Sequence, residues 1–177
     1  MTTNTALKPF LLTQKQAVVA ETHRHIDEAC IIFNTRLPYL PVTFDLRGKC
    51  AGMYKAVGDH RLIRYNPWIF AKYFEESFSN TVPHEVAHYV VHTIWGSKGV
   101  KPHGQEWRDT MLALGVPPRV TNSYDLTDVP QRSYRRYRYR CDCKTHELTI
   151  IRHQKIVHQG ARYYCKSCHG ILKRDQP

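Results

Sequence analysis

The feature that most constrains this chain is the pattern His-Glu-x-x-His at residues 84–88, inside an apolar stretch of helix length. Residues four apart lie on the same face of a helix, so His84 and His88 can offer two imidazole nitrogens to one metal ion. Glu85 lies about 100° round the helix from His84, where its carboxylate can reach a water molecule beside the ion. The pattern therefore predicts a catalytic zinc site with Glu85 as general base.

A third ligand is available in His103, which follows a loop containing Gly and Pro that can turn the chain back toward the helix. A catalytic zinc ion needs three protein ligands and one open position. His92 is a competing candidate, but it lies about 12 Å along the helix from His84, too far to share an ion with both other histidines. Two acidic residues remain as alternative third ligands: Glu106 and Asp109. The alternative for the whole pattern is an ordinary amphipathic helix with surface histidines.

The segment His84-Glu85-Val86-Ala87-His88, followed after fourteen residues by His103-Gly104-Gln105-Glu106-Trp107, resembles the SprT family of zinc metalloproteins. That family includes bacterial SprT proteins and the protease domain of eukaryotic Spartan. The resemblance runs through most of the chain. It implies a compact zincin-like fold, zinc-dependent hydrolysis of peptide bonds, and protein substrates that are associated with or crosslinked to DNA.

Two cysteine pairs near the end of the chain predict a second metal site. They are Cys141-Asp142-Cys143 and Cys165-Lys166-Ser167-Cys168. Two pairs on separate turns are typical of a tetrahedral zinc ribbon, in which a structural ion substitutes for a core too small to fold alone. Because the first pair is spaced C-x-C, His146 or His169 could replace one sulfur. Disulfides are the alternative, and without a secretory signal we expect reduced thiols instead.

Positive charge is concentrated in the last quarter of the chain. The formal net charge is +11, and residues 131–177 carry 12 Lys/Arg against 3 Asp/Glu. Arginines and tyrosines interleave at the start of this region, at Arg132, Tyr134, Arg135, Arg136, Tyr137, Arg138, Tyr139 and Arg140. Guanidinium groups bind phosphates, and tyrosine rings can stack on unpaired bases. This stretch predicts contact with DNA, including single-stranded DNA; the alternative is a β-strand with a solvated basic face.

The remaining patterns predict an α+β fold in two domains, 1–130 and 131–177. The first is expected to be a compact zincin-like metalloprotease domain, in which residues 42–46, 51–57 and 61–65 form a small antiparallel three-stranded sheet. The second is expected to be a small C-terminal β zinc-ribbon.

Helices are expected from Thr13 with a capping box, from Asn66-Pro67, over residues 82–94, and from Gly104 to Gly115. Within the ribbon a hairpin is expected from residue 148 to 158. Two finer expectations concern single residues: Thr81 or Asn80 as N-cap of the 82–94 helix, and solvated side chains at His23 and His25.

Two classes of function fit these patterns. One is a zinc metallopeptidase with one catalytic and one structural zinc ion. The other is a non-catalytic, zinc-stabilised protein that binds nucleic acid or has a regulatory role, in which Glu85 has no chemical task. A third alternative is a zinc hydrolase that acts on a non-peptide bond. No signal-peptide pattern and no apolar run near ~20 residues is present, so a cytoplasmic location without a membrane partner is expected.

Overall fold

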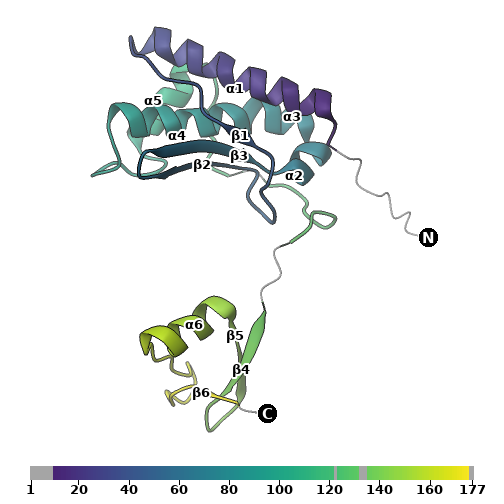
Figure 1. Ribbon diagram of the computed structural model, residues 1–177, viewed down its shortest axis with the longest axis vertical. Helices are drawn as coiled ribbons and strands as arrows, with labels where there is room; N and C mark the ends of the chain where they lie inside the picture. Colours follow the sequence, from purple (N-terminus) through teal and green to yellow (C-terminus); the bar gives the residue numbers. More distant parts are fainter. Residues whose placement is uncertain (1–9, 122, 132–134, 176–177) are drawn as a thin grey trace, which may run out of the picture. The chain divides into compact units, whose positions relative to one another are not determined.

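The computed structural model describes residues 10–121, 123–131 and 135–175. The chain divides into two compact units, Met1–Gln131 and Arg132–Pro177, and each is described by itself. The first combines several helices with a small three-stranded sheet, and in the described residues the second combines one helix with another three-stranded sheet (Figure 1). Among the described residues, no helix has both the length and the apolar character needed to cross a membrane.

The first unit opens with helix α1 (Leu12–Ile32). The helix starts one residue before Thr13, and the side chain of Gln14 accepts a hydrogen bond from the backbone N–H of Leu11 (3.0 Å), so the expected capping box at Thr13 is wrong. One face is fully buried, at Val18, Thr22, Ile26 and Ala29. Their spacing follows the 3.6-residue period of a helix that packs one stripe against a core.

The expected exposure of two histidines on α1 is wrong for His25. Its side chain is buried, and its ring nitrogens lie 3.2 Å from carboxylates of Glu21 and Glu28, about one turn away on either side. Residues four and three apart share a helix face, which explains why these acids reach the ring. His23 is partly buried and stacks on Tyr39 with 4.1 Å between ring centroids.

The sheet of the first unit contains β1 (Val42–Thr43), β2 (Gly52–Val57) and β3 (His60–Tyr65), in the order β1-β3-β2. β2 and β3 form the expected antiparallel hairpin, with Gly52 opposite Tyr65. β1 instead runs parallel to β3, so the predicted antiparallel meander is wrong for this strand.

The loop between β1 and β2 explains this difference. Residues 44–51 pass the end of β3, where the N–H of Leu46 donates to the carbonyl of Tyr65 and the N–H of Asn66 donates to the carbonyl of Ala51. The loop carries the chain across β3 instead of reversing it in a tight turn. β2 is consequently an edge strand of the three-stranded sheet.

A nearly continuous helical run follows the sheet: α2 (Pro67–Lys72), α3 (Phe74–Glu76), the π-helical turn η1 (Ser77–Thr81) and α4 (Val82–Ile94). Asn66 caps α2 as predicted, because its side-chain oxygen accepts from the N–H groups of Trp68 and Ile69. Thr81, one of the two predicted residues, stands at the N-cap position of α4, but its backbone is helical and its side chain makes no capping hydrogen bond. Pro83 cannot donate to the preceding turn, and a π turn accommodates such a break without ending the helix.

Helix α4 lies at the centre of the first unit. It packs against α1, β2 and α5 (Gln105–Ala113), and Figure 1 shows α1 and the sheet on opposite sides of it. Val82, Val86 and Val90 join the larger core cluster, while Ala87 and Val91 pack with Trp107 and Met111 of α5. Burial on several sides holds α4 rigidly, which matters for the side chains that it carries.

The second unit contains β4 (Arg136–Arg140), β5 (Thr145–Thr149), helix α6 (Ile150–Gln159) and β6 (Lys173–Arg174), with the sheet order β5-β4-β6. The hairpin expected over residues 148–158 is wrong, because most of this stretch forms α6. His153 and Ile156 face the core three residues apart, which is a helical period, and α6 ends at Gly160 in the left-handed conformation (φ 63°).

Candidate metal centre and adjoining cavities

Three histidine side chains converge beside α4. His84 and His88 lie one helical turn apart, and His103 reaches them from the loop before α5. The Nε2 atom of His84 is 3.2 Å from that of His88 and 3.1 Å from that of His103. Nitrogens bound to one tetrahedral zinc ion lie roughly 3.3 Å apart, so the three atoms fit the coordination shell of a single ion.

The surrounding residues hold these rings in place. Trp107 of α5 is fully buried against all three, with ring centroids 4.7 Å from His84, 5.8 Å from His88 and 4.8 Å from His103. The backbone carbonyl of Arg119 also accepts a hydrogen bond from the ring of His84. Such outer contacts fix the orientation of a metal-binding imidazole.

Burial keeps the helix histidines neutral. It lowers the pKa of His84 to about 4, assisted by the neighbouring His103. It also lowers the pKa of His88 to about 3, assisted by His84 and His103. Neutral imidazole is the form that binds metal, so both residues are ready ligands near pH 7.

Glu85 is buried next to this centre and faces strand β2. Its Oε2 accepts a hydrogen bond from the backbone N–H of Tyr54 at 2.6 Å. Burial raises the pKa of Glu85 to about 8, while the Tyr54 N–H acts in the opposite direction. A carboxyl group whose pKa lies near neutrality can both take up and return a proton.

Gly52 allows Glu85 to lie against β2. A Cβ atom on Gly52 would stand 2.7 Å from Cγ and Oε1 of Glu85 and 2.7 Å from Cγ2 of Thr81. Gly52 is not among the site residues predicted from the sequence. The signal was present, since a glycine inside a strand often marks the close approach of another group.

His92 lies farther along α4 and takes a separate partner. Its Nδ1 is 2.8 Å from the hydroxyl of Tyr54, the same residue whose backbone N–H binds Glu85. His92 is not one of the three histidines whose nitrogens converge.

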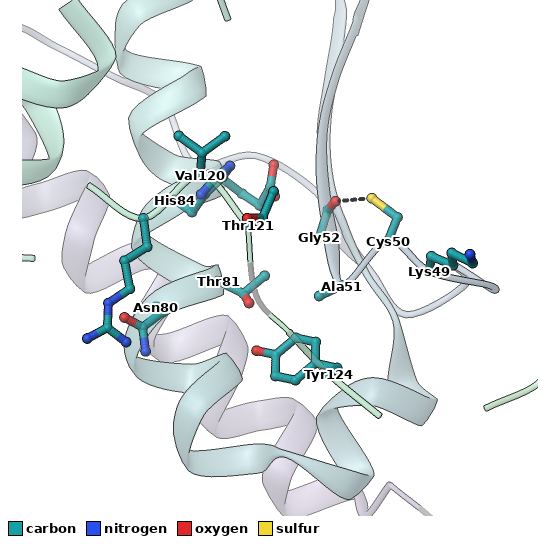
Figure 2. A pocket seen from close by; sticks show the side chains of 12 residues that line it. Lys49, Cys50, Ala51, Gly52, Asn80, Thr81, His84, Val120, Thr121 and Tyr124 are labelled. Carbon is teal, nitrogen blue, oxygen red and sulfur yellow. Dashed lines mark hydrogen bonds between the residues drawn. The ribbon is translucent and has the colours of Figure 1, made fainter. Parts of the chain in front are cut away.

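Two cavities adjoin the three histidines, and both are lined in part by His84 and Glu85. The apolar cavity measures about 580 Å³ and extends toward the C-terminal end of α4, along Met53, Tyr54, Val91, Val100 and Pro102. The smaller cavity has the more polar lining of the two and is called the polar cavity; it measures about 230 Å³ and extends toward η1 (Figure 2). Its lining includes Lys49, Asn80, Thr81, Arg119, Thr121 and Tyr124.

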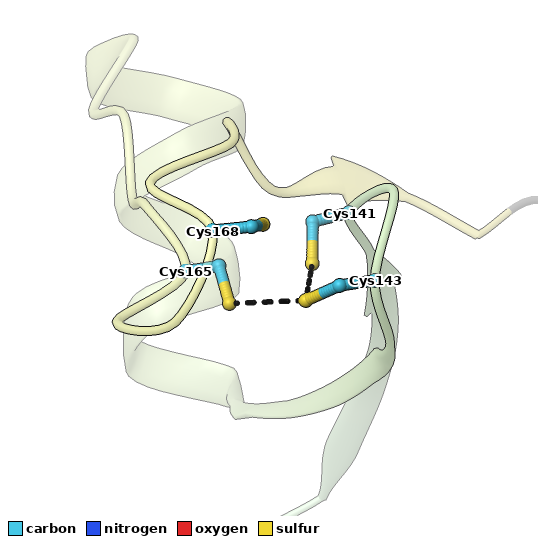
Figure 3. A group of neighbouring side chains, drawn as sticks. All are labelled: Cys141, Cys143, Cys165 and Cys168. Atoms are coloured by element: carbon cyan, nitrogen blue, oxygen red, sulfur yellow. Dashed lines mark hydrogen bonds between the residues drawn. The ribbon is translucent and has the colours of Figure 1, made fainter.

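In the second unit four cysteines gather between two turns (Figure 3). The Sγ atoms of Cys141 and Cys143 are 3.4 Å apart, and those of Cys143 and Cys165 are 3.6 Å apart, with Cys168 in the same group. Disulfide sulfurs lie about 2.05 Å apart, whereas sulfurs on one tetrahedral zinc ion lie roughly 3.8 Å apart. The arrangement therefore fits a metal ion better than disulfides.

A histidine stands beside the cysteine group. The Nε2 atom of His146 lies 3.2 Å from Sγ of Cys141. His169, the other histidine predicted as a possible replacement for a sulfur, contributes its backbone N–H to the carbonyl of Cys165. Of the two, His146 is therefore the one whose ring contacts a cysteine sulfur in the described part of the chain.

The interleaved arginines and tyrosines separate onto two faces of β4. Arg135, Arg136, Arg138 and Arg140 are exposed, while Arg132 and Tyr134 lie outside the described residues. Tyr139 is buried, and its hydroxyl is hydrogen-bonded to the ring of His153. Its ring is therefore not accessible for the stacking on bases that the sequence had predicted. Tyr137 already stacks on His153, with 3.7 Å between ring centroids. Successive side chains of a strand point to opposite faces, which is why the arginines and tyrosines of β4 lie on different faces.

The second unit also contains a cavity that no sequence pattern predicted. It measures about 360 Å³, and its lining includes Lys144, Arg152, Lys166, Tyr163 and Tyr164. Tyr164 is 57% exposed, so its ring is accessible. These residues come from α6 and from the turns that precede β5 and β6, and only the fold brings them together.

Comparison with known proteins gives consistent matches. A sequence model described as the SprT-like family matches residues 20–126. Protein SprT of Vibrio parahaemolyticus is 36% identical over 141 residues, which cover 79% of this chain and 81% of that protein. Protein SprT of Pseudomonas putida is 39% identical over 148 residues, covering 82% and 86%. Protein SprT of Pseudomonas aeruginosa is 37% identical over 153 residues, covering 82% and 89%.

Proposed function

The chain belongs to the SprT-like family, and on that premise we propose that it is a zinc-dependent metallopeptidase acting on proteins associated with or crosslinked to DNA. The observation that carries the proposal is the convergence of His84, His88 and His103 beside the buried carboxyl group of Glu85. A helix bearing two of these histidines beside a small sheet, with β2 at its edge, also suits a zincin-type domain.

In this proposal His84, His88 and His103 hold the zinc ion. Bound zinc would supply Lewis-acid chemistry, polarising the scissile carbonyl and making water more acidic. Glu85 accepts the proton of the attacking water and returns it to the leaving amine. The Tyr54 N–H orients the Glu85 carboxylate from the side of the sheet.

The outer edge of β2 offers a place for the substrate backbone. The N–H of Tyr54 points away from β3, because it bonds to Glu85. By strand alternation the backbone groups of Ala56 point the same way. An extended peptide that pairs with this edge would run beside the three histidines, in the manner of β-strand addition.

The experiment that tests the proposal compares zinc-loaded wild type with Glu85→Gln on a DNA-bound protein, each with and without single-stranded DNA. Glutamine keeps the size and an acceptor for the Tyr54 N–H but cannot act as a base, so we expect cleavage to fall by about 10²–10⁴-fold at unchanged zinc content. Equal cleavage by both proteins would contradict a general-base role. No cleavage by either, with zinc bound and DNA affinity intact, would favour the non-catalytic binding protein.

DNA binding by the second unit is supported by its exposed cations. Arg136 and Arg138 are exposed on β4, Arg135 is exposed directly before it, and a separate cavity combines three cations with accessible Tyr164. Replacing Arg135, Arg136 and Arg138 with alanine should weaken DNA binding. The slope of log K against log salt should fall by about 0.7–0.9 for each phosphate that an arginine had neutralised.

A matched control removes the same charge from the first unit. Arg36, Lys55 and Lys98 are exposed there, and their replacement with alanine should leave the salt dependence nearly unchanged. The salt slope is measured by fluorescence anisotropy with a labelled single strand and a labelled duplex. Equal effects of the two triple variants would indicate that only net charge matters.

A further inference from the structure

The polar cavity occupies a defined position relative to the histidines. Asn80 and Thr81, which precede His84 along the helical run, lie in its wall, whereas Val91 and His92 line the apolar cavity. The two cavities thus extend from the metal centre toward opposite ends of α4. A peptide that crosses the centre would place different side chains in each.

The wall of the polar cavity contains an unsatisfied hydrogen-bonding group. Thr81 is only 5% exposed, and its Oγ1 has no hydrogen-bond partner within the described part of the chain. In Figure 2 its side chain projects from the helical run toward the segment that carries Ala51 and Gly52. A buried hydroxyl without a partner is unfavourable, which indicates that a bound group completes it.

The charge of this wall is positive. Lys49 and Arg119 both line the cavity, and Glu85 is the only carboxylate among its described lining residues. Oε2 of Glu85 is already turned toward the N–H of Tyr54. With about 230 Å³, the cavity is smaller than the roughly 300–1,000 Å³ of sites for drug-sized ligands, so its size suits a single side chain.

We propose that the polar cavity is the subsite for an acidic side chain of the substrate, next to the scissile bond. Thr81 Oγ1 donates to the carboxylate, and Lys49 and Arg119 neutralise its charge. The proposal rests on the proposed peptidase function and deepens it, because it names aspartate or glutamate as the residue that directs cleavage.

Cleavage-site profiling tests the subsite. The zinc-loaded full chain is incubated with a library of synthetic peptides of randomised sequence, and the cut positions are read by mass spectrometry. We expect Asp and Glu to be enriched over Lys and Arg by roughly tenfold at one position beside the cut, the scale of one charge-assisted hydrogen bond. The double variant Lys49→Glu/Arg119→Glu should abolish or invert this enrichment.

Two further variants sharpen the result. Thr81→Val keeps the shape of the side chain but removes the donor, so the enrichment of acids should fall several-fold. Arg36→Glu/Lys98→Glu makes the same change of net charge at exposed positions that line neither cavity, and its profile should match the wild type. Zinc content and thermal unfolding confirm that each variant is folded.

The outcomes separate this proposal from the peptidase function. Cuts without enrichment of acids, or a profile unchanged by charge reversal at Lys49 and Arg119, would refute the subsite and leave the peptidase standing. If the wild type makes no cuts, the peptidase proposal fails, and binding is measured directly by NMR with N-acetylglutamate amide and N-acetylglutamine amide. Shifts at the amides of Ala51, Gly52 and Thr81 with the glutamate compound alone would support the subsite; equal shifts, or none, would refute it.

Discussion

At the scale of single residues, Gly52 matters because of the side chain that it lacks. A methyl group there would overlap Glu85 and Thr81 at 2.7 Å. We therefore expect Gly52→Ala to lower kcat for peptide cleavage by about 10²-fold, since a shift of ~1 Å in a catalytic group can cost that much. Steady-state kinetics and zinc content measured together should show a fall in kcat with the metal retained.

A double-mutant cycle shows whether Gly52 acts through Glu85. In a Glu85→Gln background the added methyl should change the residual rate little, because the proposed base is already absent. Thr81→Ser removes Cγ2, one of the crowded atoms, and should restore part of the activity of Gly52→Ala. An equal loss from Gly52→Ala in both backgrounds would mean that the methyl group acts elsewhere.

His103 belongs to the same scale, because it is the farthest in sequence of the three proposed zinc ligands. His103→Ala should weaken zinc binding at this centre by more than about 100-fold, beyond the 10–100-fold typical of outer contacts, and leave the cysteine site loaded. Metal analysis after dialysis against a weak chelator measures both sites. Unchanged zinc occupancy of the histidine site would indicate that His103 is not the third ligand and that Glu106 or Asp109 is the next candidate. Oδ1 of Asp109 accepts a hydrogen bond from Gln105.

At the scale of elements, Asn66 joins the sheet to the helical run. Its side-chain oxygen caps α2, and its Nδ2 donates to the carbonyls of Gly48 and Cys50 in the loop before β2. Asn66→Ala removes both functions in a fully buried position, so we expect the first unit to lose about 2–3 kcal/mol of unfolding free energy. Urea denaturation followed by tryptophan fluorescence measures the loss.

A smaller change at the same position separates the two functions. Asn66→Ser keeps a cap but cannot reach both loop carbonyls, so its cost should lie between those of wild type and alanine. Equal costs for serine and alanine would show that the cap contributes little.

This helix start was predictable, because Asn-Pro is a local signal that acts within one turn.

Other elements could not be predicted from local patterns. β1 pairs in parallel with β3 because the chain crosses the end of β3. This path is stabilised by contacts such as the hydrogen bond from the N–H of Leu46 to the carbonyl of Tyr65. Residues 150–159 form a helix although their isoleucines and valine also suit a strand. A short apolar run fits the period of a helix and that of a strand. In the observed helix, His153 stacks on Tyr137 and hydrogen-bonds to Tyr139.

At the scale of the whole molecule, the two units differ in how much core they possess. In the described residues the larger core cluster of the first unit contains thirteen buried side chains, and that of the second contains four, one of which is Cys165. A core this small would depend on the structural metal that we propose for the cysteine group. We expect a strong chelator to unfold the second unit while the first stays folded, as followed residue by residue with NMR.

A substitution provides the control for chelation. Cys165→Ser should unfold the second unit without chelator and leave the signals of the first in place, because Cys165 is both buried and part of the cysteine group. Persistence of the folded second unit after complete metal removal would contradict a structural metal site there.

The sequence by itself determined what depends on neighbours within one or two turns: the helix of residues 82–94, the cap at Asn66, and the close spacing of the cysteines within each pair. Only the tertiary structure decided how distant segments meet. It brought His103 to the helix histidines, buried Tyr139, and set the N–H of Tyr54 against Glu85, thirty-one positions away. The physical reason is that burial and hydrogen bonding between remote residues depend on the packing of the whole unit, which no local pattern contains.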